Sequence, residues 1–147
     1  RRLALEQFVT GVKRTALEPD ELILAVRVRS GIGAQTFMKV GPRNAMVIAV
    51  ASACVVLDPD QRSVAVALGS VGPTVLRCPE AEQHLASSID FTTFEVSPTE
   101  LERFADLVST ASHPITDHRS SAEYRRHAVG VLAKRLVRRA SSEEVAA

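Results

Sequence analysis

The sequence contains no tryptophan, one tyrosine and two cysteines, and these low counts exclude several classes of protein. Cys54 and Cys78 form neither a CxxC pair nor the disulfide framework of a small secreted domain, which indicates a reducing compartment. No apolar run is long enough to span a membrane, and the first residues, RRLALEQFVTG, lack the apolar core and cleavage site of a signal peptide. We therefore expect a cytoplasmic protein without a membrane span.

An excess of charge of either sign is also missing. The 147 residues include 18 lysines and arginines against 17 acidic residues, so whole-chain electrostatics does not call for a nucleic-acid partner. Basic residues are nevertheless concentrated at residues 117–140, in the segment DHRSSAEYRRHAVGVLAKRLVRRA. Three roles are open for this segment: a surface for nucleic acid, a set of contacts inside a larger assembly, or the solvated face of a helix, which is the usual role of a charge run.

Helix electrostatics accounts for part of this basic segment. The cations near its end would lie in the last turns of a helix, where the helix dipole favours positive charge. Arg125 and Arg126 would lie in the first turn, where the dipole disfavours them, so both need carboxylate partners. Asp117 and Glu123 are close enough in sequence to supply these partners.

Alternating apolar residues predict strands in the first half of the chain. The segment ELILAVRV predicts a strand over residues 21–28, because every second side chain is apolar on one face. The segment TFMKVG predicts a second strand over residues 36–41, and the following GPRN is a turn signal.

Two further apolar segments predict a hairpin. Residues 45–58 are apolar on both faces, and the valines of the second half favour a strand there. Residues 63–68 form the second strand of the predicted hairpin, and the turn DPDQR joins the two strands. The small side chains of Ala65 and Ala67 share one face of this strand, which predicts that another part of the structure, most simply a helix, packs closely against that face.

Helix signals follow the strands. Pro79 stands at a typical first helical position, and Ser97 with Glu100 forms a capping box. Ser120 with Glu123 predicts the same start for the last helix, whose predicted core stripe is Tyr124, Ala128, Leu132 and Leu136. Strands followed by helices favour an α+β fold, in which an antiparallel sheet of three to four strands carries about three helices on one face.

No residue of the chain forms a recognisable catalytic or metal-binding pattern. The four histidines do not fall at a known ligand spacing. The segment GIGAQT has two glycines of a dinucleotide-binding loop, but Thr36 replaces the third and a strand follows where a helix is needed. Cys54 lies in an apolar strand, where a free cysteine behaves as a small hydrophobe, and the chain has no GxSxG elbow. We therefore predict no catalytic and no metal-binding residue.

Lys39 is the strongest candidate for a binding residue. It lies at a strand end that runs into a Gly-Pro turn, with Arg43 just beyond. A solvated edge residue is the commoner role for such a lysine. The alternative is a cation directed from a rigid strand end toward an anion or the polar edge of a cofactor.

Four segments of the chain follow known patterns in the right order. The first, LALEQFVTGVKRTALEPDELILAVRV, is close to LxLExFFxGxxxTxLxxxELLxxIxxP, with Val9 in place of a phenylalanine. The second, TFMKVGPRNAMVIAVASA, is close to KxGxRxAxxIAxVSxA, and the third, ALGSVGPTVLRCPEAEQHL, to ALGxVxPTPxRxxxAExxL, with Val75 in place of proline. The fourth, DHRSSAEYRRHAVGVLAKRLVRRA, is close to DxRxSAEYRRxxxxxLxxRA. Over essentially its whole length the chain resembles the C-terminal part of the FAD-binding (medium) subunit of molybdenum hydroxylases, the carbon monoxide dehydrogenase and xanthine dehydrogenase family.

The resemblance implies a place in a multi-subunit oxidoreductase. In such enzymes a large subunit holds molybdopterin, a small subunit holds two 2Fe-2S clusters, and electrons pass through the FAD of the medium subunit to an external acceptor. Residues 1–30 would end the FAD-binding subdomain, and residues 31–147 would form the C-terminal domain. The segments that hold the FAD pyrophosphate belong to the N-terminal FAD-binding half of the subunit, so we expect this chain alone to bind FAD weakly or not at all and to be inactive.

The resemblance also assigns site residues. It implies that Lys39 contacts the flavin, that Ile23 is a neighbouring apolar contact, and that the arginine-rich helix braces the domain within its complex instead of binding nucleic acid. The alternative is a stand-alone binding or scaffold module that kept the fold without the flavin.

Overall fold

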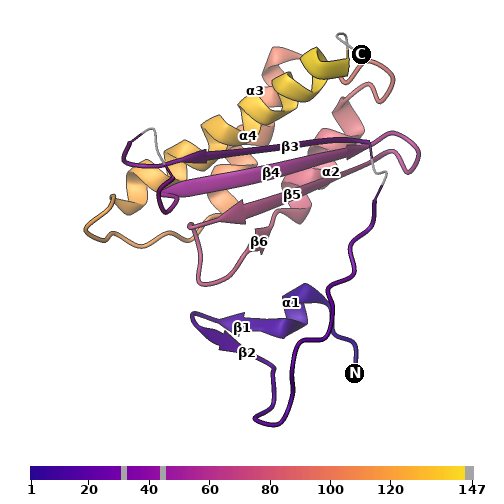
Figure 1. Ribbon diagram of the computed structural model, residues 1–147. Helices are drawn as coiled ribbons and strands as arrows, with labels where there is room; N and C mark the ends of the chain where they lie inside the picture. Colours follow the sequence, from indigo (N-terminus) through magenta and orange to yellow (C-terminus); the bar gives the residue numbers. More distant parts are fainter. Residues whose placement is uncertain (31–32, 44–45, 145–147) are drawn as a thin grey trace.

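A computed structural model describes residues 1–30, 33–43 and 46–144, and its main body is an antiparallel sheet with helices on one face (Figure 1). The sheet has four strands in the order β3-β4-β5-β6, and three long helices accompany it. The bounds are β3 Ala34–Val40, β4 Ala51–Asp58, β5 Ser63–Gly69, β6 Leu76–Arg77, α2 Pro79–Ser88, α3 Pro98–Ala111 and α4 Ala122–Glu144. This architecture confirms the predicted α+β fold.

The hairpin of β4 and β5 is the centre of the sheet and forms as predicted. Val55 lies opposite Val66, and alternate residues of both strands are buried. The connecting turn is closed by Asp58, whose carboxylate accepts a hydrogen bond from the Gln61 N–H at 3.1 Å. This short local closure, next to Pro59, makes the hairpin easy to predict from sequence.

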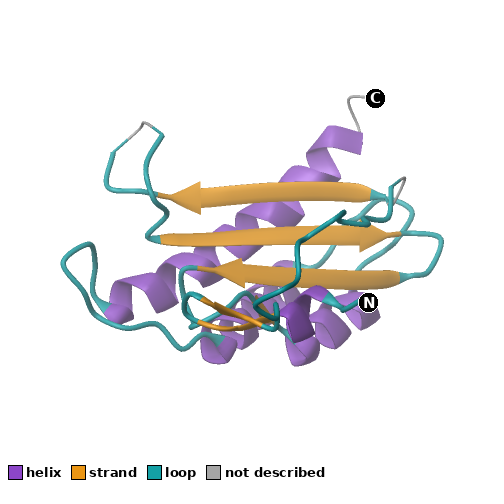
Figure 2. Ribbon diagram, turned by 60° about the horizontal axis from the view of Figure 1, so that its bottom comes forward, coloured by secondary structure: helices purple, strands orange, loops and turns teal. Residues whose placement is uncertain are grey.

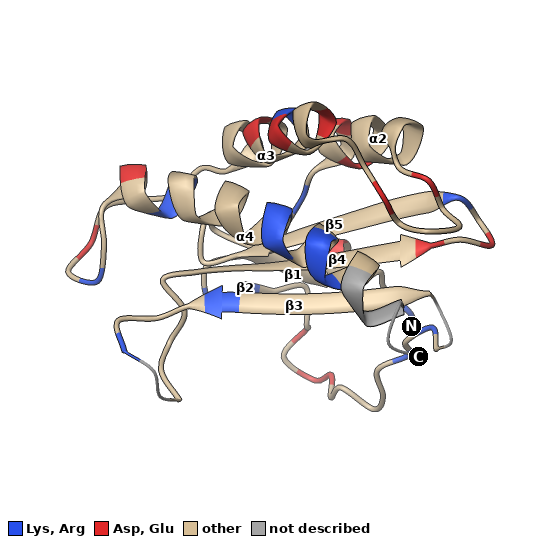
Figure 3. Ribbon diagram, turned by 90° about the horizontal axis from the view of Figure 1, so that it is seen from above, with Lys and Arg blue, Asp and Glu red and all other residues tan. Residues whose placement is uncertain are grey.

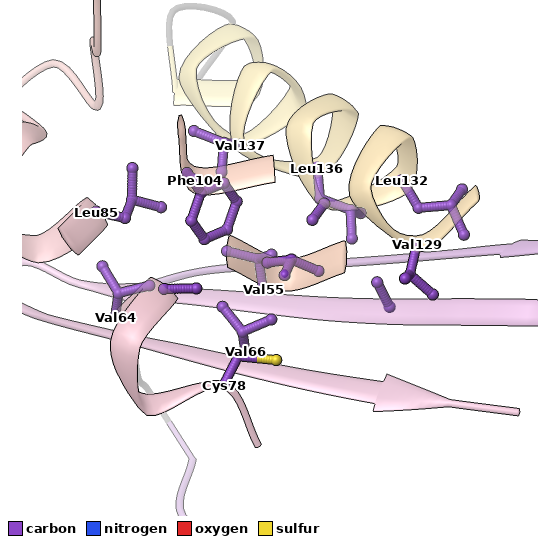
Figure 4. Close-up of a cluster of buried hydrophobic side chains, with 14 of the residues drawn as sticks. Val55, Val64, Val66, Cys78, Leu85, Phe104, Val129, Leu132, Leu136 and Val137 are labelled. Atoms are coloured by element: carbon purple, nitrogen blue, oxygen red, sulfur yellow. The ribbon is translucent and has the colours of Figure 1, made fainter. Parts of the chain in front are cut away.

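One face of the hairpin packs against all three helices. Val55 and Val66 meet Leu85 of α2, Phe104 of α3 and Leu136 of α4, and all five side chains are 0% exposed (Figure 4). Burying a side chain of this size contributes about 1.5–3 kcal/mol relative to leaving it in water. The apolar contact therefore holds the helices on a single side of the sheet (Figure 2).

The other face of the sheet, which we call the open face, is not covered by α2, α3 or α4 in the described part of the chain. Its positions alternate with the buried ones and comprise Gln35, Phe37, Lys39, Ser52, Cys54, Val56, Ala65, Ala67 and Gly69. The prediction that a helix packs against Ala65 and Ala67 is therefore wrong. The helices cover the opposite side because its valine and leucine side chains offer more apolar area to bury.

The helix starts are partly as predicted. The Ser97 side chain accepts a hydrogen bond from the Glu100 N–H at 3.3 Å, which confirms this cap of α3. The predicted cap of α4 at Ser120 is wrong by one residue, because Ser121 accepts the hydrogen bond, from the Tyr124 N–H at 3.1 Å. Tyr124 itself is 50% exposed and does not belong to the core stripe, whereas the other three residues of that stripe are buried.

α4 is 23 residues long, which is enough to raise the question of a membrane span. Neither α4 nor another helix of the described residues is long and apolar enough to cross a membrane.

The predicted strand at residues 21–28 does not form. Residues 1–30 contain a short unit of α1 Leu5–Phe8, β1 Val9–Gly11 and β2 Arg14–Thr15, followed by an extended segment without strand pairing. Leu22 and Leu24 are 92% and 98% exposed. A strand needs a neighbour that takes up its backbone hydrogen bonds, and none of the described strands pairs with this segment. The alternating pattern therefore indicates a tendency to form a strand, but it does not say which other strand would pair with this segment.

A matched pair of substitutions tests the two faces of the hairpin. Val55→Asp puts a carboxylate into the core and should cost on the order of several kcal/mol, a large part of the stability of a domain. Val56→Asp, one residue away on the half-buried open face, should cost much less. Urea denaturation of both variants measures the difference, and equal losses would contradict the assignment of the faces.

Candidate functional site

Lys39 lies at the end of β3 and belongs to the open face; this end of the strand is blue in Figure 3. Its exposed ammonium donates a hydrogen bond to the Val47 carbonyl at 2.9 Å, so it is held against the loop between β3 and β4. Gly41 permits the close approach of that loop, since a Cβ at this position would lie 2.4 Å from Cγ2 of Val47. Lys39 is thus an exposed cation at a strand end, as its position in the sequence indicated, and its contact with a flavin stays a prediction.

The surface beside Lys39 is made of small residues. Ser52 lies opposite Lys39, and Gly69 lies opposite Ser52 on the next strand. A Cβ at Gly69 would lie 2.5 Å from the Ser52 Oγ, so glycine keeps this part of the sheet shallow. Ala67 continues the surface, and Phe37, which is 60% exposed, borders it. The arrangement is a flat area of small side chains with an exposed cation at one end.

The same end of the sheet is held from the helix side by Arg125. Its side chain is 5% exposed, and its Nη1 donates hydrogen bonds to the carbonyls of Val50 at 2.9 Å and Ser70 at 3.0 Å. Its Nη2 donates to Oδ1 of Asp117 at 2.5 Å. The predicted carboxylate partner of Arg125 is therefore confirmed, whereas the two carbonyl contacts were not predicted.

Asp117 is held in its charged form by local hydrogen bonds. The backbone N–H of Arg119 contributes most, and the Arg125 guanidinium and the Ser120 N–H add to it, so that the pKa of Asp117 is lowered to about 2. These bonds build a tight turn in front of α4, in which Asp117 and Ser120 also pair through their backbones. The carboxylate that partners Arg125 is thus ionised throughout the physiological pH range.

The family follows from a comparison of the sequence with known protein families. Residues 36–140 match the model of the CO dehydrogenase flavoprotein C-terminal domain. The chain belongs to this family. No curated protein matches the chain.

Solved structures agree with this assignment to the CO dehydrogenase flavoprotein C-terminal domain family. Reconstituted CO dehydrogenase from Oligotropha carboxidovorans is similar to the chain with 29% identity and a TM-score of 0.75, covering 92% of this chain. Carbon monoxide dehydrogenase from Hydrogenophaga pseudoflava, at 24% identity and a TM-score of 0.75, and quinoline 2-oxidoreductase from Pseudomonas putida 86, at 18% identity and a TM-score of 0.80, share the fold. The chain spans 47% of the length of each of these three chains.

The second predicted site residue, Ile23, lies away from Lys39. It is 61% exposed in the extended segment that precedes β3, whereas Lys39 lies near the far end of that strand. Lys39 is five positions along β3 from Ala34, which corresponds to about 16 Å. The structure therefore does not bring the two predicted residues together, and a shared contact would require a ligand that reaches both.

The two cysteine thiols and the possible metal ligands of the described residues can be assessed from burial and spacing. Burial raises the pKa of the Cys54 thiol, and it raises that of Cys78 to about 11, so both thiols stay protonated near neutral pH. Within the described residues, no three histidine, cysteine, aspartate or glutamate side chains come together as metal ligands. A shallow hollow near the end of α4, lined by Asp90, Glu95 and Arg138 among others, lies on the helix layer and not on the open face.

The lowered pKa of Asp117 predicts how its contribution to stability depends on pH. An unfolded aspartate titrates near 3.9, so the stabilisation is complete above about pH 5 and is lost as the pH falls toward about 2. Asp117→Asn cannot titrate, so its melting temperature should lie below that of the wild type at pH 7 and approach it in acid. Asp106→Asn, which changes an exposed carboxylate on α3, is the control. A difference that stays constant down to about pH 2 would contradict this account.

Proposed function

We propose that the chain is the C-terminal portion of the FAD-binding subunit of a molybdopterin-dependent hydroxylase or dehydrogenase. In this role it supports flavin binding, electron transfer from iron–sulfur clusters to an external acceptor, and docking of the subunits. The family match over residues 36–140 carries the proposal. The partners are a large molybdopterin subunit, a small 2Fe-2S subunit and the N-terminal FAD-binding half of the same subunit, and the complex works in the cytoplasm.

The open face fits the flavin ring. FAD supplies the redox chemistry when it is bound. The flat surface of Ser52, Ala67 and Gly69 can pack against a planar ring, and a side chain larger than glycine at position 69 would intrude on Ser52. Lys39 adds one positive charge at the border of this surface, where it can meet the polar edge of the ring.

Lys39 would favour negative charge on the reduced flavin. Its ammonium is already anchored by the Val47 carbonyl at 2.9 Å, so little side-chain freedom is lost when a ligand binds. A cation near a site from which water is partly excluded interacts more strongly than it does in bulk water. Lys39 therefore belongs to the cofactor-binding residues of the proposal, and its role there is electrostatic.

Residues 1–30 belong, in this proposal, to the end of the FAD-binding subdomain, and residues 31–147 form the C-terminal domain. None of residues 1–30 is buried, and the apolar side chains of residues 22–28 are exposed on both sides of the extended segment. Such a segment gains stability when a neighbouring strand pairs with it and covers it. Ile23 would then become an apolar contact of the flavin site.

The exposed flanks of α4 are the proposed docking surface. Arg126 and Arg135 are exposed on this helix and lie half a turn apart around its axis. Exposed arginines on a rigid helix suit the planar, bidentate recognition of carboxylates on a partner subunit. Retention on DNA that falls steeply with salt would instead support the nucleic-acid alternative.

The role of Lys39 is tested by the redox potential of the flavin in the assembled complex. Lys39→Ala should leave the fold intact, because the side chain is exposed. It should destabilise the reduced flavin relative to the oxidised flavin by on the order of 1 kcal/mol. For two electrons this is a fall of about 20 mV in midpoint potential. Arg103→Ala, which removes an exposed charge from α3 in the helix layer, should leave the potential unchanged. Equal potentials in wild type and Lys39→Ala would leave Lys39 as a solvated edge residue.

A further inference from the structure

We propose that Arg125 is a positioning residue for Lys39: its buried guanidinium fixes the start of β4, at which the loop that holds the Lys39 ammonium is anchored, against the end of β5. The inference rests on the proposed function for its link to the flavin. Its structural half, the control of the loop between β3 and β4, stands on the contacts of Arg125 alone.

Arg125 joins two neighbouring strands where their pairing ends. Val50 directly precedes β4 and Ser70 directly follows β5, and one Nη1 atom donates to both carbonyls. Ser70 has a φ of 63°, a left-handed conformation that is uncommon for serine, so its carbonyl direction needs external support. A single rigid group therefore sets the orientation of both strand ends.

The position of Val50 determines the loop that holds Lys39. The Val50 N–H donates to the Val40 carbonyl at 2.7 Å, which closes the loop at its base. Within this loop Val47 accepts the hydrogen bond of the Lys39 ammonium. Arg125 is thus two steps from Lys39: it holds Val50, and the loop anchored at Val50 presents the carbonyl to which Lys39 donates.

Arg125 makes more hydrogen bonds than the neutralisation of its buried charge requires. Asp117 alone supplies the opposite charge, at 2.5 Å, and the turn before α4 fixes that carboxylate. The two carbonyl contacts also fix the positions of Val50 and Ser70 relative to the guanidinium, because this planar group presents its donors in a fixed fork. Nε of Arg125 has no partner among the described residues, so the Nη donors alone hold the group in place. A lysine could keep the charge, but it cannot reproduce the fork.

The first arm of the test is hydrogen exchange of the assembled complex, read on peptides. Arg125→Lys should raise the exchange of the Val50 amide and the adjacent strand end by about tenfold, because a hydrogen bond to a charged group is lost there. Arg103→Lys, which changes an exposed arginine on α3 in the same way, is the control and should change nothing at Val50. Unchanged exchange at Val50, or an equal rise spread over α2 and α3, would overturn the inference, because either result removes the local control of the loop.

The second arm is a double-mutant cycle on the midpoint potential of the flavin. Arg125→Lys should lower the potential in the same direction as Lys39→Ala, and it should add no further shift in the Lys39→Ala background. A shift that persists in that background would overturn the inference, since Arg125 would then act by another route. If Arg125→Lys does not assemble, Asp117→Asn loosens the same guanidinium and takes its place in both arms, with the same outcomes expected.

The two proposals fail in different ways. If Lys39→Ala leaves the potential unchanged while Arg125→Lys still raises exchange at Val50, the flavin contact of Lys39 is wrong and the control of the loop by Arg125 is supported. If Lys39→Ala lowers the potential while Arg125→Lys changes neither exchange nor potential, the flavin contact is supported and the positioning role is wrong.

Discussion

The burial of one face of the β4–β5 hairpin is the constraint on which the rest of the structure depends. Val55, Val66 and the leucines of that face exclude water only when α2, α3 and α4 lie together on the same side. The helices cannot then cover the other side, so the open face with Lys39 is a direct consequence of the core. Function in this family member is thus expected on the side of the sheet that the core leaves uncovered.

The two layers are connected by buried polar contacts at one end of the sheet and nearer the other end, on β3. Arg125 reaches from α4 to the ends of β4 and β5, and the hydroxyl of Thr36 donates to the carbonyl of Leu136 at 3.2 Å. Buried polar contacts of this kind select one arrangement of the layers, because a shifted arrangement would leave donors and acceptors unpaired. The helix layer therefore influences the geometry of the opposite face without touching it.

Local features of the fold could be predicted from the sequence, and partners distant in the chain could not. The hairpin, the cap at Ser97 and the pairing of Arg125 with Asp117 depend on residues a few positions apart. The contacts of Arg125 with the carbonyls of Val50 and Ser70 span 75 and 55 positions and leave no periodic signal. The strand predicted at residues 21–28 failed for the same reason, since its alternation is real but no described strand pairs with it.

The candidate site was predictable only in part. Lys39 could be recognised by its place before a Gly-Pro turn, but the flat surface beside it depends on the register that places Ser52 between Lys39 and Gly69. The small residues of the hairpin predict a close contact, but residue size alone does not say which ligand or element makes it. The family assignment changes that interpretation, and the open face becomes the proposed cover of the flavin.

The most direct test of this account is the FAD content of the complete subunit when the open face is blocked. Ala67→Arg puts a long charged side chain onto the flat surface without entering the core, and Thr99→Arg adds the same side chain to the exposed side of α3. Absorbance of the purified complex gives the ratio of flavin to polypeptide in each variant. The account predicts that Ala67→Arg loses most of its FAD while its helix content and the FAD of Thr99→Arg are unchanged. Full FAD content in Ala67→Arg would contradict the central claim that the open face covers the flavin.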